Sequence, residues 1–411
     1  MFNSLKGRFS LGAGRGAIFL FLFNTFSILF IGEVLTNRIA ASLGEAGQGN
    51  QWIGITYPAS IIVSMIIGAA IFSRINRQRF FVAWAILGVI SSVFLPLSTM
   101  SNASGILSIA IIGSLIGIGL PSLLAHFAHI VPVENRGTLG GSVLLLTTLA
   151  VPFVSIAMSG LNLMSSAIIF AVWRGWSLPI LFFMSRRNDQ DATETTNLSF
   201  ATVIRERPFI LYFVVWLMFC AIDGFEWIIL NRRSDEFRFA LNVVEPLIAG
   251  FAAFVAGVLS DLVGRKRLLI FGFVSLGIAY ATIGFAPQFW FSWILYFVID
   301  GLTIGTLWVL FIVVLWGDLA HGRSEKHYSI GEIPFFLTRI IAMLLAPLAT
   351  LVPEYSAFSL AAFFLFVAVI PLFYAPETLP EKNIKDRELK QYIKKAKKNE
   401  RKTHMNIKKN N

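Results

Sequence analysis

The sequence predicts an all-α polytopic membrane protein with twelve transmembrane helices in two pseudo-symmetric six-helix bundles. Three observations lead to this fold class. Of the 411 residues, 56% are hydrophobic and only 14% are charged. The mean hydropathy is +0.72, and a soluble domain cannot cover that much apolar surface. The apolar residues also gather in runs that are long enough to cross a bilayer.

The twelve spanning segments fall into two sets of six. The first set is predicted at residues 16–36, 51–72, 80–100, 105–127, 138–160 and 163–185. The second set is predicted at residues 208–230, 240–260, 268–286, 290–316, 329–351 and 356–376. We therefore expect a first bundle over 1–185, a polar cytoplasmic linker over 186–207, a second bundle over 208–378 and a basic tail over 379–411.

Basic residues predict the orientation of these segments. Twelve of the 34 Lys and Arg residues follow Leu379, whereas the outer loops would hold only Arg38, Arg232, Arg233 and Arg238. Loops rich in Lys and Arg stay in the cytoplasm, so we expect a multi-pass protein of the cell (plasma) membrane with both termini inside. The basic tail is expected to be attracted to anionic lipid headgroups of the bilayer, and nothing in it resembles a nucleic-acid recognition module.

Glycine positions predict an internal repeat. Gly113-x-x-x-Gly117 in the fourth segment is followed 188 residues later by Gly301-x-x-x-Gly305 in the tenth. Such spacing permits close helix packing, which a rocking interface between bundles also needs. The alternative is a coincidence, since glycine is common in membrane helices.

The loop after the eighth segment carries the most informative pattern. Gly257, Asp261, Gly264, Arg265 and Lys266 stand between two apolar runs. An acid at a helix end can hold a neighbouring helix through its N-terminal amides or through a cation. A contact made in one conformation and broken in another biases a two-state equilibrium, so we interpret this loop as a gate. The alternative is an anchor that only keeps the loop inside.

This loop resembles the signature loop of the major facilitator superfamily, Gly-x-x-x-Asp-(Arg)-x-Gly-Arg-(Arg/Lys). Its counterpart after the second segment keeps Arg74 and Arg77 but has Ser73 and Asn76 in place of the acid and the glycine. The ending Pro376-Glu377-Thr378 resembles that of sugar-porter-like branches. The resemblance implies a secondary transporter in which two bundles rock around a central cavity lined by the first, fourth, seventh and tenth helices.

Four of the acids inside the apolar runs are candidates for function, because ionisable groups are costly in a bilayer. Asp223 and Glu226 lie in the seventh segment, Asp300 in the tenth and Glu33 in the first. The resemblance would let them face one another in the cavity. Clustered, buried carboxylates bind protons more readily, which suits a proton-coupling site. The alternative is structural ion pairing, or for Glu33 simple contact with outer water.

Two arginines and a tryptophan complete the candidates. Arg339 lies near the middle of the eleventh segment, and we expect it to contact an anionic substrate or the Asp300/Asp223 pair. Arg174, in the sixth segment, is expected either to form a structural pair or to lie in a distorted helix. Trp227, beside Glu226, is a candidate for the cavity wall.

The predicted function is secondary active transport of a small solute, as a monomeric symporter or antiporter with protons as the coupling ion. The substrate and the direction of transport stay open. The alternative is a transporter-like membrane sensor or assembly subunit that does not transport. We expect no enzyme activity, no cofactor, no metal and no nucleic-acid partner, because the sequence has no phosphate-binding Gly-x-x-x-x-Gly-Lys-Ser/Thr loop, nucleophile–base pair or metal-ligand cluster.

Overall fold

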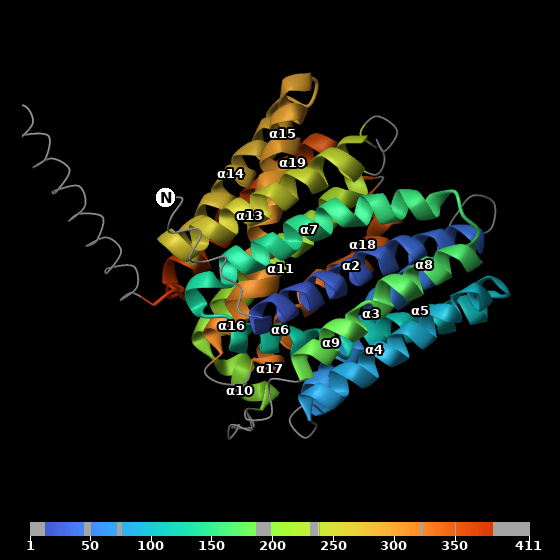
Figure 1. Ribbon diagram of the computed structural model, residues 1–411. Helices are drawn as coiled ribbons and strands as arrows, with labels where there is room; N and C mark the ends of the chain where they lie inside the picture. The colour runs from blue at the N-terminus through green and yellow to red at the C-terminus, as the bar shows by residue number, and fades with distance from the viewer. Residues whose placement is uncertain are drawn as a thin grey trace, which may run out of the picture.

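The protein is all-α, as the sequence predicts (Figure 1). A computed structural model describes residues 13–44, 51–71, 76–185, 199–230, 237, 239–320, 324–349 and 351–380. No strand occurs among these residues. In Figure 1 the helices of the first half (blue to green) and those of the second half (yellow to red) form two groups that meet along α7 and α13.

The first half contains the following elements: α2 (Ala13–Ser42), α3 (Gln51–Ile71), α4 (Arg77–Val93), the 3₁₀ turn η2 (Leu95–Thr99), α5 (Asn102–Gly117), α6 (Leu120–Ile130), α7 (Val133–Ser159), α8 (Leu163–Gly175) and α9 (Ser177–Ser185). Two predicted segments are each divided in two. The fourth breaks at residues 118–119, directly before Pro121, because a proline is favoured in the first turn of a new helix. The sixth breaks at Trp176, after Gly175.

The second half contains α10 (Phe200–Arg205), α11 (Arg207–Leu230), the π-helix η4 (Ala240–Val244), α13 (Glu245–Val263), α14 (Arg265–Phe285), α15 (Trp290–Leu307), the π-helix η5 (Trp308–Leu315), α16 (Trp316–Leu319), α17 (Glu325–Gly331), α18 (Ile333–Ala349) and α19 (Glu354–Tyr374). The short helix α10 lies within the predicted linker. Residues 186–198 of the linker and residues 381–411 of the tail lie outside the described residues. The four domain boundaries therefore stay predictions.

Eleven helices of the described residues are long and apolar enough to cross a membrane. The remaining predicted segment, 80–100, corresponds to α4, which has 17 residues and is continued by η2. A straight helix needs about 20 residues to span the hydrocarbon core, so α4 is close to that length with its extension. The twelve predicted segments thus all have helical counterparts.

The two repeated glycine motifs pack within their own halves. A Cβ on Gly117 would lie 2.4 Å from the carbonyl oxygen of Ile61 on α3, and a Cβ on Gly305 would lie 2.0 Å from that of Ala249 on α13. Equivalent helix pairs are therefore joined in the two halves, which agrees with the internal repeat. The motifs thus permit close helix packing, as expected, and the helices that they join belong to the same half.

A different set of glycines brings the two halves together. On α7, a Cβ at Gly137 would lie 2.4 Å from the carbonyl oxygen of Gly257, and a Cβ at Gly141 would lie 2.3 Å from that of Ala253. A Cβ at Gly257 would lie 2.1 Å from the carbonyl oxygen of Gly137. The backbones of α7 and α13 therefore touch, and only glycine permits that approach.

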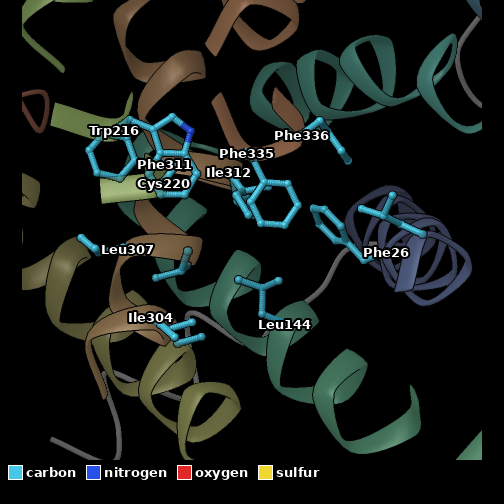
Figure 2. Close-up of a cluster of buried hydrophobic side chains, with 14 of the residues drawn as sticks. Phe26, Leu144, Trp216, Cys220, Ile304, Leu307, Phe311, Ile312, Phe335 and Phe336 are labelled. Atoms are coloured by element: carbon cyan, nitrogen blue, oxygen red, sulfur yellow. The ribbon is translucent and has the colours of Figure 1, made fainter. Parts of the chain in front are cut away.

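The centre of the contact between the halves is apolar and aromatic (Figure 2). Phe26 of α2 and Leu144 of α7 face the buried Phe335 and Phe336 of α18 and Ile312 of η5. Beside them, the rings of Phe30 and Trp308 stack across the halves with centroids 5.5 Å apart. Hydrophobic side chains thus fill the space where the family resemblance expects a cavity.

Candidate gating and coupling sites

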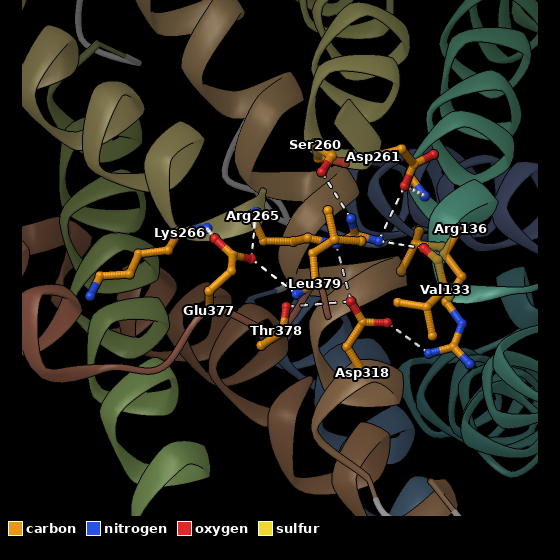
Figure 3. Close-up of polar contacts among 12 residues, drawn as sticks. Val133, Arg136, Ser260, Asp261, Arg265, Lys266, Asp318, Glu377, Thr378 and Leu379 are labelled. Carbon is orange, nitrogen blue, oxygen red and sulfur yellow. Dashed lines mark hydrogen bonds and ion pairs between the residues drawn. The ribbon is translucent and has the colours of Figure 1, made fainter. Parts of the chain in front are cut away.

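Asp261 joins the end of α13 to the beginning of α7 (Figure 3). Its side chain is fully buried. One carboxylate oxygen accepts the backbone N–H of Gly137 at 3.0 Å, and the other accepts the N–H and the hydroxyl of Thr138, both at 2.7 Å. A carboxylate is well placed near a helix N-terminus, where the helix dipole is positive. Asp261 therefore holds the N-terminal amides of a neighbouring helix, which is one of the contacts expected from the sequence. Its gating role stays a prediction.

Arg265 is the hub of the same network. Its guanidinium donates to Asp261 and to Asp318, each at 3.1 Å, and to the carbonyl oxygen of Val133 on α7 at 2.6 Å. It also donates to the carbonyl oxygen of Ser260 at 2.8 Å, and the side chain is fully buried. The planar guanidinium can hold several acceptors in fixed directions, which a lysine cannot do. Arg265 therefore ties two acids and both halves together.

Asp318 and Arg136 complete the network from positions that the sequence analysis did not select. Arg136 of α7 donates to Asp318 of α16 at 2.7 Å and to the carbonyl oxygen of Val131 at 3.0 Å. Thr378 donates to the other oxygen of Asp318 at 3.4 Å. We call Asp261, Arg265, Asp318 and Arg136 the α7–α13 latch. The two carboxylates and the two guanidinium groups of the latch balance in charge, which reduces the free-energy cost of burying them.

Gly264 and Lys266 shape the loop within the second half. Gly264 has φ = +102°, a conformation that favours glycine, and it ends α13. Glu377 then accepts the backbone N–H groups of Arg265 and Lys266 at 2.8 and 3.1 Å, so it caps α14. The ammonium group of Lys266 donates to the carbonyl oxygens of Phe373 and Ala375, both at 2.9 Å, and points away from the latch (Figure 3).

The counterpart loop is different. Arg74 lies outside the described residues. Arg77, 188 positions before Arg265, donates to Glu325 of α17 at 2.6 Å and lies 3.3 Å from Nδ1 of His126. We call Arg77 and Glu325 the α4–α17 pair. Asn76, which replaces the family's glycine, accepts the N–H groups of Gln78 and Arg79 and so caps α4.

The acids of the membrane segments form a cluster in the second half. Glu226 is buried and accepts a hydrogen bond from the hydroxyl of Tyr280. Asp300 is 1% exposed, and its Oδ1 has no hydrogen-bond partner. Asp223 and Glu245 lie close enough to both to interact electrostatically. Glu245 was not predicted from the sequence, although its position as an acid within the predicted segment 240–260 could have identified it.

Glu33 does not join this cluster. Arg339 of α18 donates to Glu33 of α2, so the pair spans the two halves, and the guanidinium carbon lies 4.7 Å from the centroid of the Phe335 ring. Arg339 thus pairs with Glu33 and not with the expected Asp300/Asp223 pair, while the other alternative, contact with an anionic substrate, stays a prediction. Asp223 feels the field of Arg339 without touching it. Trp227 is 54% exposed, whereas Glu226 beside it points inward, because adjacent residues of a helix are turned by about 100°.

A small pocket lies beside the Glu33–Arg339 pair. Tyr57, Phe335 and Phe336 line it together with the two charged residues. Its cavity volume is about 20 Å³, which is room for about one water molecule. In this structure the pocket is therefore too small for a metabolite, although the side chains of Arg339 and Glu33 are 30% and 31% exposed.

Comparison with known proteins relates these sites to a family. Residues 236–405 match the family model "Major Facilitator Superfamily". No curated protein matches the sequence.

Two solved structures share the fold. The human organic anion transporter MFSD10 (TETRAN) is 13% identical with a TM-score of 0.62, and the alignment covers 88% of this chain and 100% of that one. The proton:xylose symporter XylE is 14% identical with a TM-score of 0.62, and the alignment covers 88% and 96%. The chain therefore matches the family's sequence model over residues 236–405 and shares the fold of these two transporters over most of its length.

Proposed function

We propose that the protein carries a small solute across the membrane by alternating access, coupled to protons. The observation that carries the proposal is the α7–α13 latch, in which a fully buried arginine holds one half of the molecule against the other. The fold is one that transporters use, which supports a transporter rather than an enzyme. Nothing in the comparisons favours the alternative of a sensor or assembly subunit.

Two contacts at different depths support alternating access. The latch joins the halves where α7 begins and α13 ends, the end that we infer to be cytoplasmic. The Glu33–Arg339 pair joins them farther along, since Glu33 lies 20 residues after Ala13 on a helix that rises about 1.5 Å per residue. Opening one contact while the other stays closed would expose the centre to one side at a time.

Protons are the coupling ion that best suits the acid cluster. Glu226 and Asp300 are buried, and neither forms an ion pair within the described residues. A buried carboxylate without a cation is stabilised by taking up a proton. Asp223 and Glu33 both attract Arg339. A proton on Asp223 would therefore leave Arg339 to Glu33 alone and strengthen the contact between the halves.

An organic anion with an apolar body is the solute class that we propose. The side chains between the halves are aromatic and aliphatic, which disfavours a sugar. Arg339, which lies beside these side chains, stands over the Phe335 ring and would exchange Glu33 for the carboxylate of a solute. The organic anion transporter MFSD10 and the xylose symporter XylE share the fold equally, so the choice rests on Arg339 and its aromatic surroundings.

Proteoliposome transport under an imposed pH gradient tests the proposal. Purified protein should carry aromatic carboxylates but not xylose, and uptake should move protons. Asp223→Asn should retain solute exchange between the two sides but lose the proton flux. Asp261→Asn should lower both by about tenfold or more, because an amide nitrogen would face the N–H donors of α7. No flux for any carboxylate, combined with stable capture of a partner protein, would support the sensor alternative.

A further inference from the structure

We propose that the first half binds a small monatomic anion, such as chloride, against Arg174. This arginine lies in the last turn of α8 and is 3% exposed. Its Nη1 has no hydrogen-bond partner. The site is separate from the latch and from the acid cluster, which are built on other helices, and the inference does not depend on the proposed transport function.

Gly88 of α4 makes room for the guanidinium. A Cβ at this position would lie 2.1 Å from Nε of Arg174, 2.5 Å from Cζ and 2.7 Å from Nη2. The guanidinium therefore rests directly on the backbone of α4. Phe21, Asn24 and Trp84 enclose it further, together with Ser177 of α9. The helices thus enclose the guanidinium of Arg174, and this cation does not lie at the lipid surface.

Among the residues that the structure describes, no acid stands beside Arg174 to balance its charge. No described carboxylate lines the cavity, and Tyr57 is the one ionisable neighbour in this part of the chain that interacts electrostatically with Arg174. The expected structural pair is thus not found among the described residues, and the break between α8 and α9 supports the alternative of a distorted helix. A guanidinium does not lose its proton, and an unpaired charge in a bilayer core is costly. A bound anion removes that cost.

The size of the cavity decides the class of anion. It measures about 10 Å³, which admits a single particle of the size of a water molecule and excludes a phosphate or an organic acid. A water could bridge Nη1 of Arg174 and the equally unpartnered Oδ1 of Asn24. Such a water would satisfy hydrogen bonds but leave the charge uncompensated. A halide neutralises the charge and, as a single atom only slightly larger than a water molecule, comes nearest to the size of the cavity among the common anions, so we favour it.

The three helices around Arg174 suggest what the anion does. α2, α4 and α8 contribute Asn24, Gly88 and Arg174, and Asn24 also donates to the carbonyl oxygen of Trp173 on α8 at 2.7 Å. An anion at this point would hold the three helices together, so its removal should loosen the first half. The expected effect is a dependence of stability on chloride itself rather than on ionic strength.

Thermal unfolding and diffraction test the proposal on the full-length protein. Replacing gluconate by chloride or bromide at equal ionic strength should raise the melting temperature saturably, by about 2–4 °C. Crystals grown in bromide should show an anomalous peak beside Arg174. Arg174→Gln should abolish the halide effect. Arg38→Gln is the matched control, because Arg38 lies in the same half and donates to the carbonyl oxygen of Met158 and to Ser166, at 2.8 and 2.9 Å; it should keep the effect.

Two outcomes would overturn the inference. One is equal melting temperatures in chloride and gluconate together with no bromide peak. The other is density for a water that bridges Arg174 and Asn24. Both are read on the unmodified protein, so the test stands even if Arg174→Gln fails to fold.

Discussion

The two arginines at equivalent positions of the repeat, Arg265 and Arg77, form contacts of very different character. Arg265 is fully buried and serves two acids and two carbonyl oxygens. The side chain of Arg77 is 33% exposed and serves one acid, Glu325, with His126 alongside. Both contacts join the halves at the same end of the molecule. The repeat thus contains one network around a fully buried arginine and one ion pair whose arginine is partly exposed.

The difference follows from which helix carries the acid. In the latch, Asp261 at the end of α13 reaches the amides that begin α7. The counterpart of Asp261 is Ser73, which has no charge to offer, and the carboxylate stands instead on the opposite helix as Glu325, in the first turn of α17. An acid there also benefits from the positive end of its own helix. The α4–α17 pair therefore forms without an acid at the position equivalent to Asp261. It is a single ion pair, and its arginine side chain is partly exposed to water.

The largest expected effect separates Arg265 from Arg77. Arg265→Met leaves Asp261 and Asp318 buried without their shared cation, and breaking a buried pair in this way costs about 3–5 kcal/mol. Arg77→Met breaks a pair whose arginine side chain is 33% exposed but whose acid is only 6% exposed, and leaving one buried acceptor unpaired costs about 1–3 kcal/mol. Thermal unfolding of detergent-purified protein should therefore show a larger drop for the first variant than for the second.

Arg265→Lys is the control for charge. It restores the cation without the guanidinium geometry, so we expect only partial recovery. Equal destabilisation by Arg265→Met and Arg77→Met would mean that burial does not distinguish the two contacts, and the comparison would fail.

The sequence allowed the prediction of the helices and of two members of the latch, Asp261 and Arg265, but not of their partners. Apolar run lengths depend on local composition, and they predicted the spanning segments. Asp261 and Arg265 were recognised because they stand together in one loop. Asp318 and Glu377 come from distant parts of the chain, and only the packing of α14, α16 and α19 brings them to Arg265. The partner of Arg339 was missed for the same reason, since depth along a helix does not determine the direction of a side chain.

A second prediction uses two glycines that are equally crowded but differently placed. Gly257→Ala would put a methyl group 2.1 Å from the carbonyl oxygen of Gly137 on the other half, and Gly305→Ala would put one 2.0 Å from that of Ala249 in the same half. Overpacking of this kind costs about 1–3 kcal/mol. We expect Gly257→Ala to shift the protein towards the state with the latch open, whereas Gly305→Ala should lower stability without that shift.

Labelling of an introduced cysteine measures the shift towards the state with the latch open. The native Cys220 is buried, so a thiol introduced by Val313→Cys can be read against it. Val313 is fully buried in η5 and lies against Gly140 of α7. A maleimide added from the latch side should react about tenfold faster in Gly257→Ala, and at an unchanged rate in Gly305→Ala. The opposite ranking would place the moving interface within a half instead of between the halves.

The smallest expected effect concerns salt. Ions weaken the attraction between exposed charges, because the Debye length falls from about 10 Å at 0.1 M to about 3 Å at 1 M salt, but they barely affect a buried pair. Glu325→Gln should therefore raise the labelling rate of Val313→Cys only at low salt, by less than about fivefold, and should have no effect at 1 M sodium gluconate. The double variant Arg77→Glu/Glu325→Arg should restore the slow rate at low salt, since it reverses the pair without removing it. A Glu325→Gln effect that persists at 1 M salt would show that the α4–α17 pair is shielded from water during gating. The latch and the α4–α17 pair would then differ in their residues but not in their exposure to water.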